Sequence, residues 1–179
     1  GHRAALESAP GRTRGWMVAA LAGFALGVVY LFWPAFASGF ERLPGDLGDF
    51  RFVNLMLEHW YRVVTGQAPW RDPNYFYPQP GVLGYSDALF LHAVPYVVFR
   101  LARLSPFYAY FCTLVAILGI GYAGTLWLLR RILDIAWPIA IATAMIFMFS
   151  NMIALKIIHA NLYAVAFVPL VVGLLWRVV

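Results

Sequence analysis

The sequence predicts an all-α integral membrane protein, and two observations support this prediction. Of its 179 residues, 63% are hydrophobic and only 12% are charged, against roughly 25% charged residues in soluble domains. The apolar residues also form four long runs without Asp, Glu, Lys or Arg, at residues 15–40, 104–129, 135–155 and 160–176. Each run is long enough for a helix across a hydrocarbon core of about 30 Å, so we expect four transmembrane helices.

The first run follows a short basic segment that predicts its orientation. Arg3, Arg12 and Arg14 precede it, so the positive-inside bias places residues 1–15 in the cytoplasm and the end of the first run outside. Within that segment, Gly1-His2 without an initiating Met is typical of a removed tag. Because the sequence stops inside an apolar run, we expect the transmembrane module at 16–179 to be the N-terminal part of a longer protein.

A fifth apolar run, at 88–99, has only twelve residues and leaves two topologies open. If it crosses the membrane, Arg100 and Arg103 are cytoplasmic, but Arg130 and Arg131 are left outside. If it lies in the interface or re-enters, Arg130 and Arg131 reach the cytoplasm, as the positive-inside bias prefers. We favour the second arrangement, which makes 39–105 a large first external loop and 151–161 a second external loop on the same side.

The first loop holds six of the eight acidic residues of the chain and contains a predicted surface helix. Asp49 is a suitable N-cap, and the apolar residues that follow recur with the 3.6-residue period of a helix. Glu58 and Arg62 stand four residues apart and can pair on its polar face. We expect this helix to lie on the bilayer with its apolar face towards the lipid.

Asp46 and Asp49 lie three residues apart, where the first run meets the headgroups. One interpretation is structural: a turn at Asp46 and a helix cap at Asp49. The other is catalytic, because a partly desolvated carboxylate can serve as a general base. Two carboxylates also offer oxygen ligands for a divalent metal, but without a third convergent ligand we expect no metal or other cofactor.

Other polar residues near the two external loops are candidates for substrate binding. Lys156, His159 and Asn161 lie in the second external loop at 151–161, where they form either an ordinary interfacial loop or a phosphate-binding group. Arginines in the first loop are suited to a lipid phosphate or to headgroup anchoring, and Tyr85 to a sugar or a headgroup. Asp87 is expected to cap the helix that begins at residue 88, and His92 to be an interfacial histidine. The phosphate candidates are Arg51, Arg100 and Arg103.

Several function classes are excluded or disfavoured. The net charge of +5 comes without a basic stripe carrying interleaved aromatics, so we expect no nucleic-acid partner. The sequence GIGYAG at 119–124 lies inside an apolar run and indicates close helix packing, not a nucleotide loop. The single Cys112 predicts packing and excludes a disulfide framework. Because the sequence contains no nucleotide-binding motif, a transferase with this sequence would take its activated donor from the membrane.

The order of these features resembles the N-terminal part of the GT-C superfamily of polytopic glycosyltransferases, which use lipid-linked phosphosugars. The segments that carry the resemblance are GDLGDFR, NYFYPQPGVLGYSDALF, LWLLRRILD and FMFSNMIALKIIHANLYAVAFVPL, and it covers residues 16–179. The resemblance implies a catalytic carboxylate at the start of the first external loop. It also implies a polyprenyl-phosphate sugar donor and chemistry on the periplasmic or extracellular face. Asp49 matches the carboxylate best and Asp46 is second. The second loop has no acidic residue, which favours a metal-independent transfer.

We therefore expect an inverting membrane glycosyltransferase of the bacterial inner or plasma membrane, in contact with membrane lipids. Its acceptor would be a glycan, a lipid or a protein. One alternative is a non-catalytic relative that binds lipid or serves as a scaffold. A transporter fragment is less favoured, because the four runs carry no Asp, Glu, Lys or Arg at their centres, whereas transporters usually place ionisable groups there.

Overall fold

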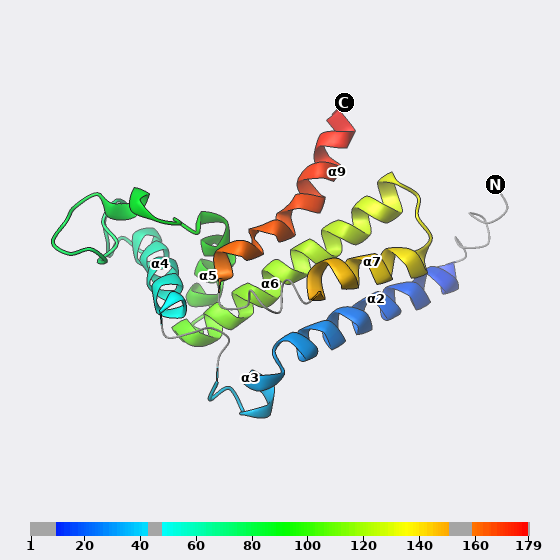
Figure 1. Ribbon diagram of the computed structural model, residues 1–179, viewed down its shortest axis with the longest axis horizontal. Helices are drawn as coiled ribbons and strands as arrows, with labels where there is room; N and C mark the ends of the chain where they lie inside the picture. The colour runs from blue at the N-terminus through cyan, green and yellow to red at the C-terminus, as the bar shows by residue number, and fades with distance from the viewer. Residues whose placement is uncertain (1–9, 43–47, 151–158, 179) are drawn as a thin grey trace.

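The computed structural model describes the fold of residues 10–42, 48–150 and 159–178. All regular secondary structure in these residues is helical, which confirms the predicted fold class (Figure 1). The α-helices are α2 (Pro10–Leu31), α3 (Trp33–Ala37), α4 (Asp49–Val64), α5 (Phe90–Leu101), α6 (Pro106–Trp127), α7 (Trp137–Phe149) and α9 (Val168–Val178). Three shorter elements are the 3₁₀ helix η1 (Val82–Tyr85), the π-helical turn η2 (Leu128–Ile132) and the 3₁₀ helix η3 (Ala160–Phe167).

Three helical segments are long and apolar enough to cross a membrane, as expected for the first, second and fourth apolar runs. They are Thr13–Leu31, Pro106–Ile132 and Ala160–Val178. The third run gives the shorter helix α7, whose 13 residues rise about 20 Å. Since residues 151–158 lie outside the described part of the chain, the structure supports a membrane protein with three candidate spans and does not confirm the count of four.

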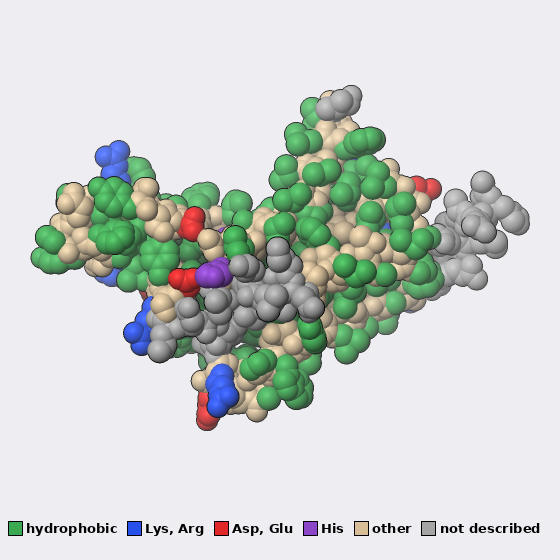
Figure 2. Space-filling model, in the orientation of Figure 1, with side chains coloured by type: hydrophobic (Ala, Val, Ile, Leu, Met, Phe, Trp, Pro, Cys, Tyr) green, Lys and Arg blue, Asp and Glu red, His purple; other side chains and the backbone are tan. Residues whose placement is uncertain are grey.

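Helix α6 is the centre of the bundle and packs against α5, α7, η3 and α9. The close approach of α6 to η3 and α9 depends on the small residues of GIGYAG at 119–124. A Cβ at Gly121 would stand 2.9 Å from the Cα of Ala166, and a Cβ at Gly124 would stand 3.4 Å from the backbone nitrogen of Leu170. This confirms that GIGYAG is a packing motif. Figure 2 shows hydrophobic side chains over most of this part of the surface, which suits contact with lipid tails.

Helices α4 and α5 lie at one end of the bundle, beside the start of α6 (Figure 1). Val53, Met56 and Leu57 of α4 are at most 4% exposed, because α4 packs on α5 and α6. The prediction that this apolar face lies on the bilayer is therefore wrong: protein covers it. The pattern of α4 was correct, but an apolar face does not specify whether lipid or protein will cover it.

Candidate functional site

Asp49 and His159 form the centre of the candidate site. Asp49 is the first residue of α4, and Gly48 is the N-cap, so the predicted capping role of Asp49 is wrong by one position. His159 directly precedes η3. Its Nδ1 lies 2.5 Å from Oδ2 of Asp49, although the two residues are far apart in sequence. Asp49 also lies in the first turn of α4, at the positive end of the helix dipole, where an acidic side chain stabilises the helix.

The Asp49–His159 pair opens on a small cleft of about 140 Å³. Figure 2 shows the histidine and acidic side chains next to one another on the surface near α4. Ligand pockets usually measure about 300–1,000 Å³, so this cleft has room for one polar group or one sugar ring and not for a whole lipid-linked donor. Asp49 thus faces a cleft shared with His159. The lining residues are Asp49, Phe52, Val53, Ser86, Asp87, Leu89, His159 and Asn161.

A second polar pair completes the cleft. Nδ2 of Asn161 donates a hydrogen bond of 2.8 Å to Oδ2 of Asp87. The expected helix cap at Asp87 is wrong, because α5 begins at Phe90 and its N-cap is Leu89, which has a left-handed backbone. Asp87 instead presents its carboxylate to the cleft. The site therefore contains two carboxylates, and His159 and Asn161 each contact one of them.

His92 contacts Ala160, the residue between His159 and Asn161. It is 3% exposed, and its Nε2 lies 2.8 Å from the carbonyl oxygen of Ala160, a geometry in which a protonated Nε2 donates. Burial lowers the pKa of His92, so the neutral imidazole is favoured. His92 was expected to be an interfacial histidine, and the structure shows it buried with a backbone partner. The consecutive residues 159, 160 and 161 thus each contact a different residue of the segment 49–92.

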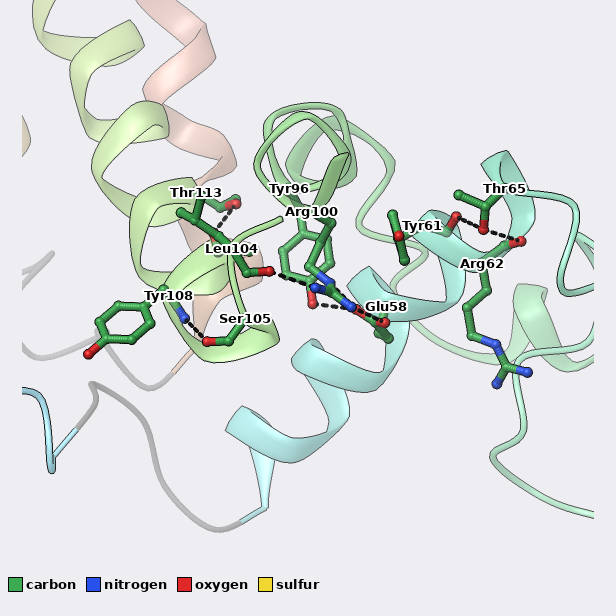
Figure 3. Close-up of polar contacts among 11 residues, drawn as sticks. Glu58, Tyr61, Arg62, Thr65, Tyr96, Arg100, Leu104, Ser105, Tyr108 and Thr113 are labelled. Atoms are coloured by element: carbon green, nitrogen blue, oxygen red, sulfur yellow. Dashed lines mark hydrogen bonds and ion pairs between the residues drawn. The ribbon is translucent and has the colours of Figure 1, made fainter. Parts of the chain in front are cut away.

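Arg100 lies outside the cleft and has a structural role (Figure 3). Its Nε and Nη2 donate to Glu58 at 2.8 and 2.9 Å, and its Nη1 donates to the carbonyl of Leu104 at 2.6 Å. Hydrogen bonding to Glu58 raises the pKa of Arg100. The predicted pairing of Glu58 with Arg62 is therefore wrong, and the predicted phosphate role of Arg100 is replaced by an ion pair that joins α4 to α5.

The remaining predicted binding residues are not gathered at the cleft. Arg51, Tyr85 and Arg103 are exposed and are not among the lining residues. Asp46 and Lys156 lie outside the described residues. Ser86 and Leu89 line the cleft but were missed by the sequence reasoning, since neither belongs to a periodic pattern or to a charged motif.

Buried polar groups near the site lack partners among the described residues. These are the side-chain amide of Asn54 and the hydroxyls of Tyr110 and Tyr163. They lie on α4, α6 and η3, and the ring of Tyr110 contacts Phe50, the residue after Asp49, with centroids 5.1 Å apart. An unpaired buried polar group costs about 1–3 kcal/mol, but none of these three residues lines the cleft.

Within the described part of the chain, no cluster of three or more His, Cys, Asp or Glu side chains is arranged to hold a metal ion. Comparison with protein-family models, with curated proteins and with solved structures found no match. The geometry of the site is therefore the basis for a functional proposal.

Proposed function

We propose that this chain is a catalytic module of a membrane glycosyltransferase that takes a sugar from a polyprenyl-phosphate donor. The observation that carries the proposal is the Asp49–His159 pair at a cleft on one end of an apolar helical bundle. A simple helix cap would need no partner from a segment so distant in sequence. A general base needs this kind of orientation by a second group.

The proposed topology places the site at the external membrane face. With the N-terminus in the cytoplasm, α2 leads outwards, α6 returns, α7 leads outwards again as the third crossing, and η3 with α9 returns as the fourth. α5 has 12 residues and rises about 18 Å, so it is assigned to the interface. The start of α6 and the start of η3, which contact α4 and lie near it in Figure 1, are then both external, where a lipid-borne donor presents its headgroup.

The proposed reaction is a single displacement with inversion. Asp49 removes the proton from an acceptor hydroxyl as that oxygen attacks the anomeric carbon of the donor sugar. The bond between this carbon and the phosphate oxygen breaks, and polyprenyl phosphate leaves with the electron pair. His159 orients the carboxylate of Asp49, and Asp87 with Asn161 hydrogen-bonds sugar hydroxyls. Arg51, which lies outside the cleft, and Lys156 are proposed to hold the donor phosphate, and Asp46 to support Asp49. The reaction needs no metal.

The experiment is a transfer assay with radiolabelled polyprenyl-phosphosugar and the full-length protein in the membrane. Asp49→Asn keeps the shape of the side chain but removes the base, and general-base catalysis usually contributes about 10²–10⁴-fold. We expect a loss in this range with normal folding. Asp134→Asn is the matched control, because Asp134 is exposed and lies in the turn between η2 and α7. Wild-type activity in Asp49→Asn would refute the proposal.

A non-catalytic scaffold is the alternative, and the assay separates it from an enzyme. A scaffold predicts no transfer by the wild-type protein with any polyprenyl-phosphosugar. The cleft and its two carboxylate pairs favour the enzyme, since a partner-binding surface needs no concave polar site.

A further inference from the structure

The loop between α4 and α5 exposes several large aromatic rings. Phe76 is 60% exposed, Tyr77 is 87% exposed and Tyr85 is 64% exposed. Aromatic side chains normally contribute large buried areas to protein cores and interfaces. Several such rings exposed on one loop are typical of a surface that binds another molecule.

The loop is held in one conformation by bonds between its two arms. The hydroxyl of Tyr75 donates to the carbonyl of Val82 at 2.8 Å, and the backbone nitrogen of Gly81 donates to Oδ1 of Asp72 at 2.5 Å. The ring of Tyr75 also packs edge-on against Phe52 of α4, with centroids 5.3 Å apart. The exposed rings therefore stand on a braced loop, which lowers the entropy cost of binding to them.

Phe76 and Tyr85 form a ring pair that we name the aromatic platform. Their centroids are 6.2 Å apart and their planes are tilted by 48°. Tyr85 directly precedes Ser86 and Asp87, which line the cleft. A chain molecule that lies across the platform can thus continue into the cleft beside Asp49.

Charge and position indicate the chemistry of this ligand. Asn74 and Gln79 are exposed amides on the same loop, and the two charges of its first arm, Arg71 and Asp72, have opposite signs. Such a surface suits a neutral ligand rich in hydroxyls. Figure 1 shows the loop projecting beyond α4, on the side away from α2, α6 and α7, so it points away from the segments that suit a lipid core.

We propose that the aromatic platform binds the acceptor as a carbohydrate chain, so that the acceptor of the proposed transferase is a glycan. This proposal rests on the proposed function and adds the acceptor class and its binding surface. The C–H groups on the face of a sugar ring are slightly positive and lie on the negative π-faces of Phe76 and Tyr85. The amides of Asn74 and Gln79 hydrogen-bond the hydroxyls at the edge of the sugar.

The first test measures glycan binding by saturation-transfer NMR. The protein is held in phospholipid nanodiscs, because detergents with sugar headgroups would compete. The probes are linear hexasaccharides of mannose, glucose and N-acetylglucosamine. We expect wild-type protein to bind at least one of them, and Phe76→Ala and Tyr85→Ala each to weaken that binding about tenfold. Trp33→Ala, which removes an aromatic ring of α3 that is 62% exposed, should leave binding unchanged.

Equal binding by the platform variants and the wild type, or no binding to any of the three probes, would overturn the proposal. A second measurement tests the lipid alternative with a nitroxide on Tyr85→Cys in a Cys112→Ala background, which is feasible because Cys112 is the only cysteine. We expect collisions with a water-soluble nickel relaxant to dominate over those with oxygen. A label submerged in the bilayer would also overturn the proposal.

The kinetic test separates failure of the platform from failure of the proposed function. In the transfer assay, Phe76→Ala and Tyr85→Ala should raise the acceptor KM about tenfold and leave kcat near the wild-type value. If Asp49→Asn abolishes transfer while the platform variants keep a normal acceptor KM, only the platform proposal fails. If the wild type transfers no sugar but binds the hexasaccharide through the platform, only the proposed function fails.

Discussion

The ion pair between Glu58 and Arg100 makes the sharpest stability prediction. It joins the middle of α4 to the end of α5 through two hydrogen bonds of 2.8 and 2.9 Å. Tyr96 donates a third bond of 2.8 Å to Glu58, and the guanidinium also lies 4.6 Å from the ring centroid of Tyr61. We consider the variants Arg100→Ala, Glu58→Gln and the combination of both.

The magnitude follows from the burial of the pair. The side chains of Arg100 and Glu58 are 17% and 29% exposed, so the pair is partly buried. An exposed ion pair contributes up to about 1 kcal/mol to stability, and disruption of a fully buried one costs about 3–5 kcal/mol. We therefore expect Glu58→Gln to lower the free energy of unfolding by about 2 kcal/mol. Arg100→Ala should cost about 3 kcal/mol, because it also removes the bond to Leu104, which is worth about 1 kcal/mol.

The assay is a double-mutant cycle measured by denaturant unfolding in micelles and followed by circular dichroism. If the two residues act through each other, the double variant should cost about 3.5 kcal/mol in place of the additive 5 kcal/mol, a coupling of about 1.5 kcal/mol. Arg62→Ala serves as the control. Figure 3 shows Arg62 pointing away from Glu58, so it should change stability by less than about 0.5 kcal/mol.

Two results would refute this reasoning. A coupling near zero between the two positions would show that the ion pair contributes no specific stability. Another pattern of results would support the predicted phosphate role of Arg100. In that pattern Arg100→Ala keeps the wild-type stability but raises the donor KM, and Glu58→Gln changes neither quantity.

Two further predictions concern His92 and Gly121. Because burial places the pKa of His92 below its ordinary value of 6.5, the unfolded chain gains a proton at this position before the folded protein does as the pH falls below 6.5. The free energy of unfolding should therefore decrease as the pH is lowered below 6.5. His92→Phe should remove this part of the dependence of unfolding free energy on pH. It should also lower the free energy of unfolding by about 1–3 kcal/mol at neutral pH, because the bond to Ala160 is lost. An unchanged pH dependence in denaturation curves from pH 7 to 5 would contradict this. Gly121→Ala places a Cβ 2.9 Å from the backbone of Ala166 and should cost about 1–3 kcal/mol. Gly119→Ala meets nothing closer than 3.5 Å and should be neutral or stabilising, so equal thermal unfolding temperatures for the two glycine variants would count against close packing of α6 on η3.

The helical class and the membrane character could be predicted because they depend on composition and on run length. Three of the four charge-free runs became helices long enough to cross a membrane, and the position of α4 followed from its 3.6-residue pattern. The partners of the charged residues could not be predicted in this way. Glu58 has a suitable partner four residues later in Arg62, but the structure pairs it with Arg100, 42 residues away. Asp87 likewise bonds to Asn161, 74 residues away, where local spacing carries no information.

The position of the candidate site was more predictable than its contacts, and topology gives the physical reason. In the proposed topology the first and second loops both follow an outward crossing and emerge at the same face, so they can lie near each other. Carboxylates concentrated in the first loop and polar residues in the second are then expected to meet, whatever their separation in sequence. In the structure, Asp49 and His159 join these two segments by a contact of 2.5 Å. Its detailed geometry depends on the packing of α4 against α5, α6 and η3, which the sequence pattern of α4 does not specify.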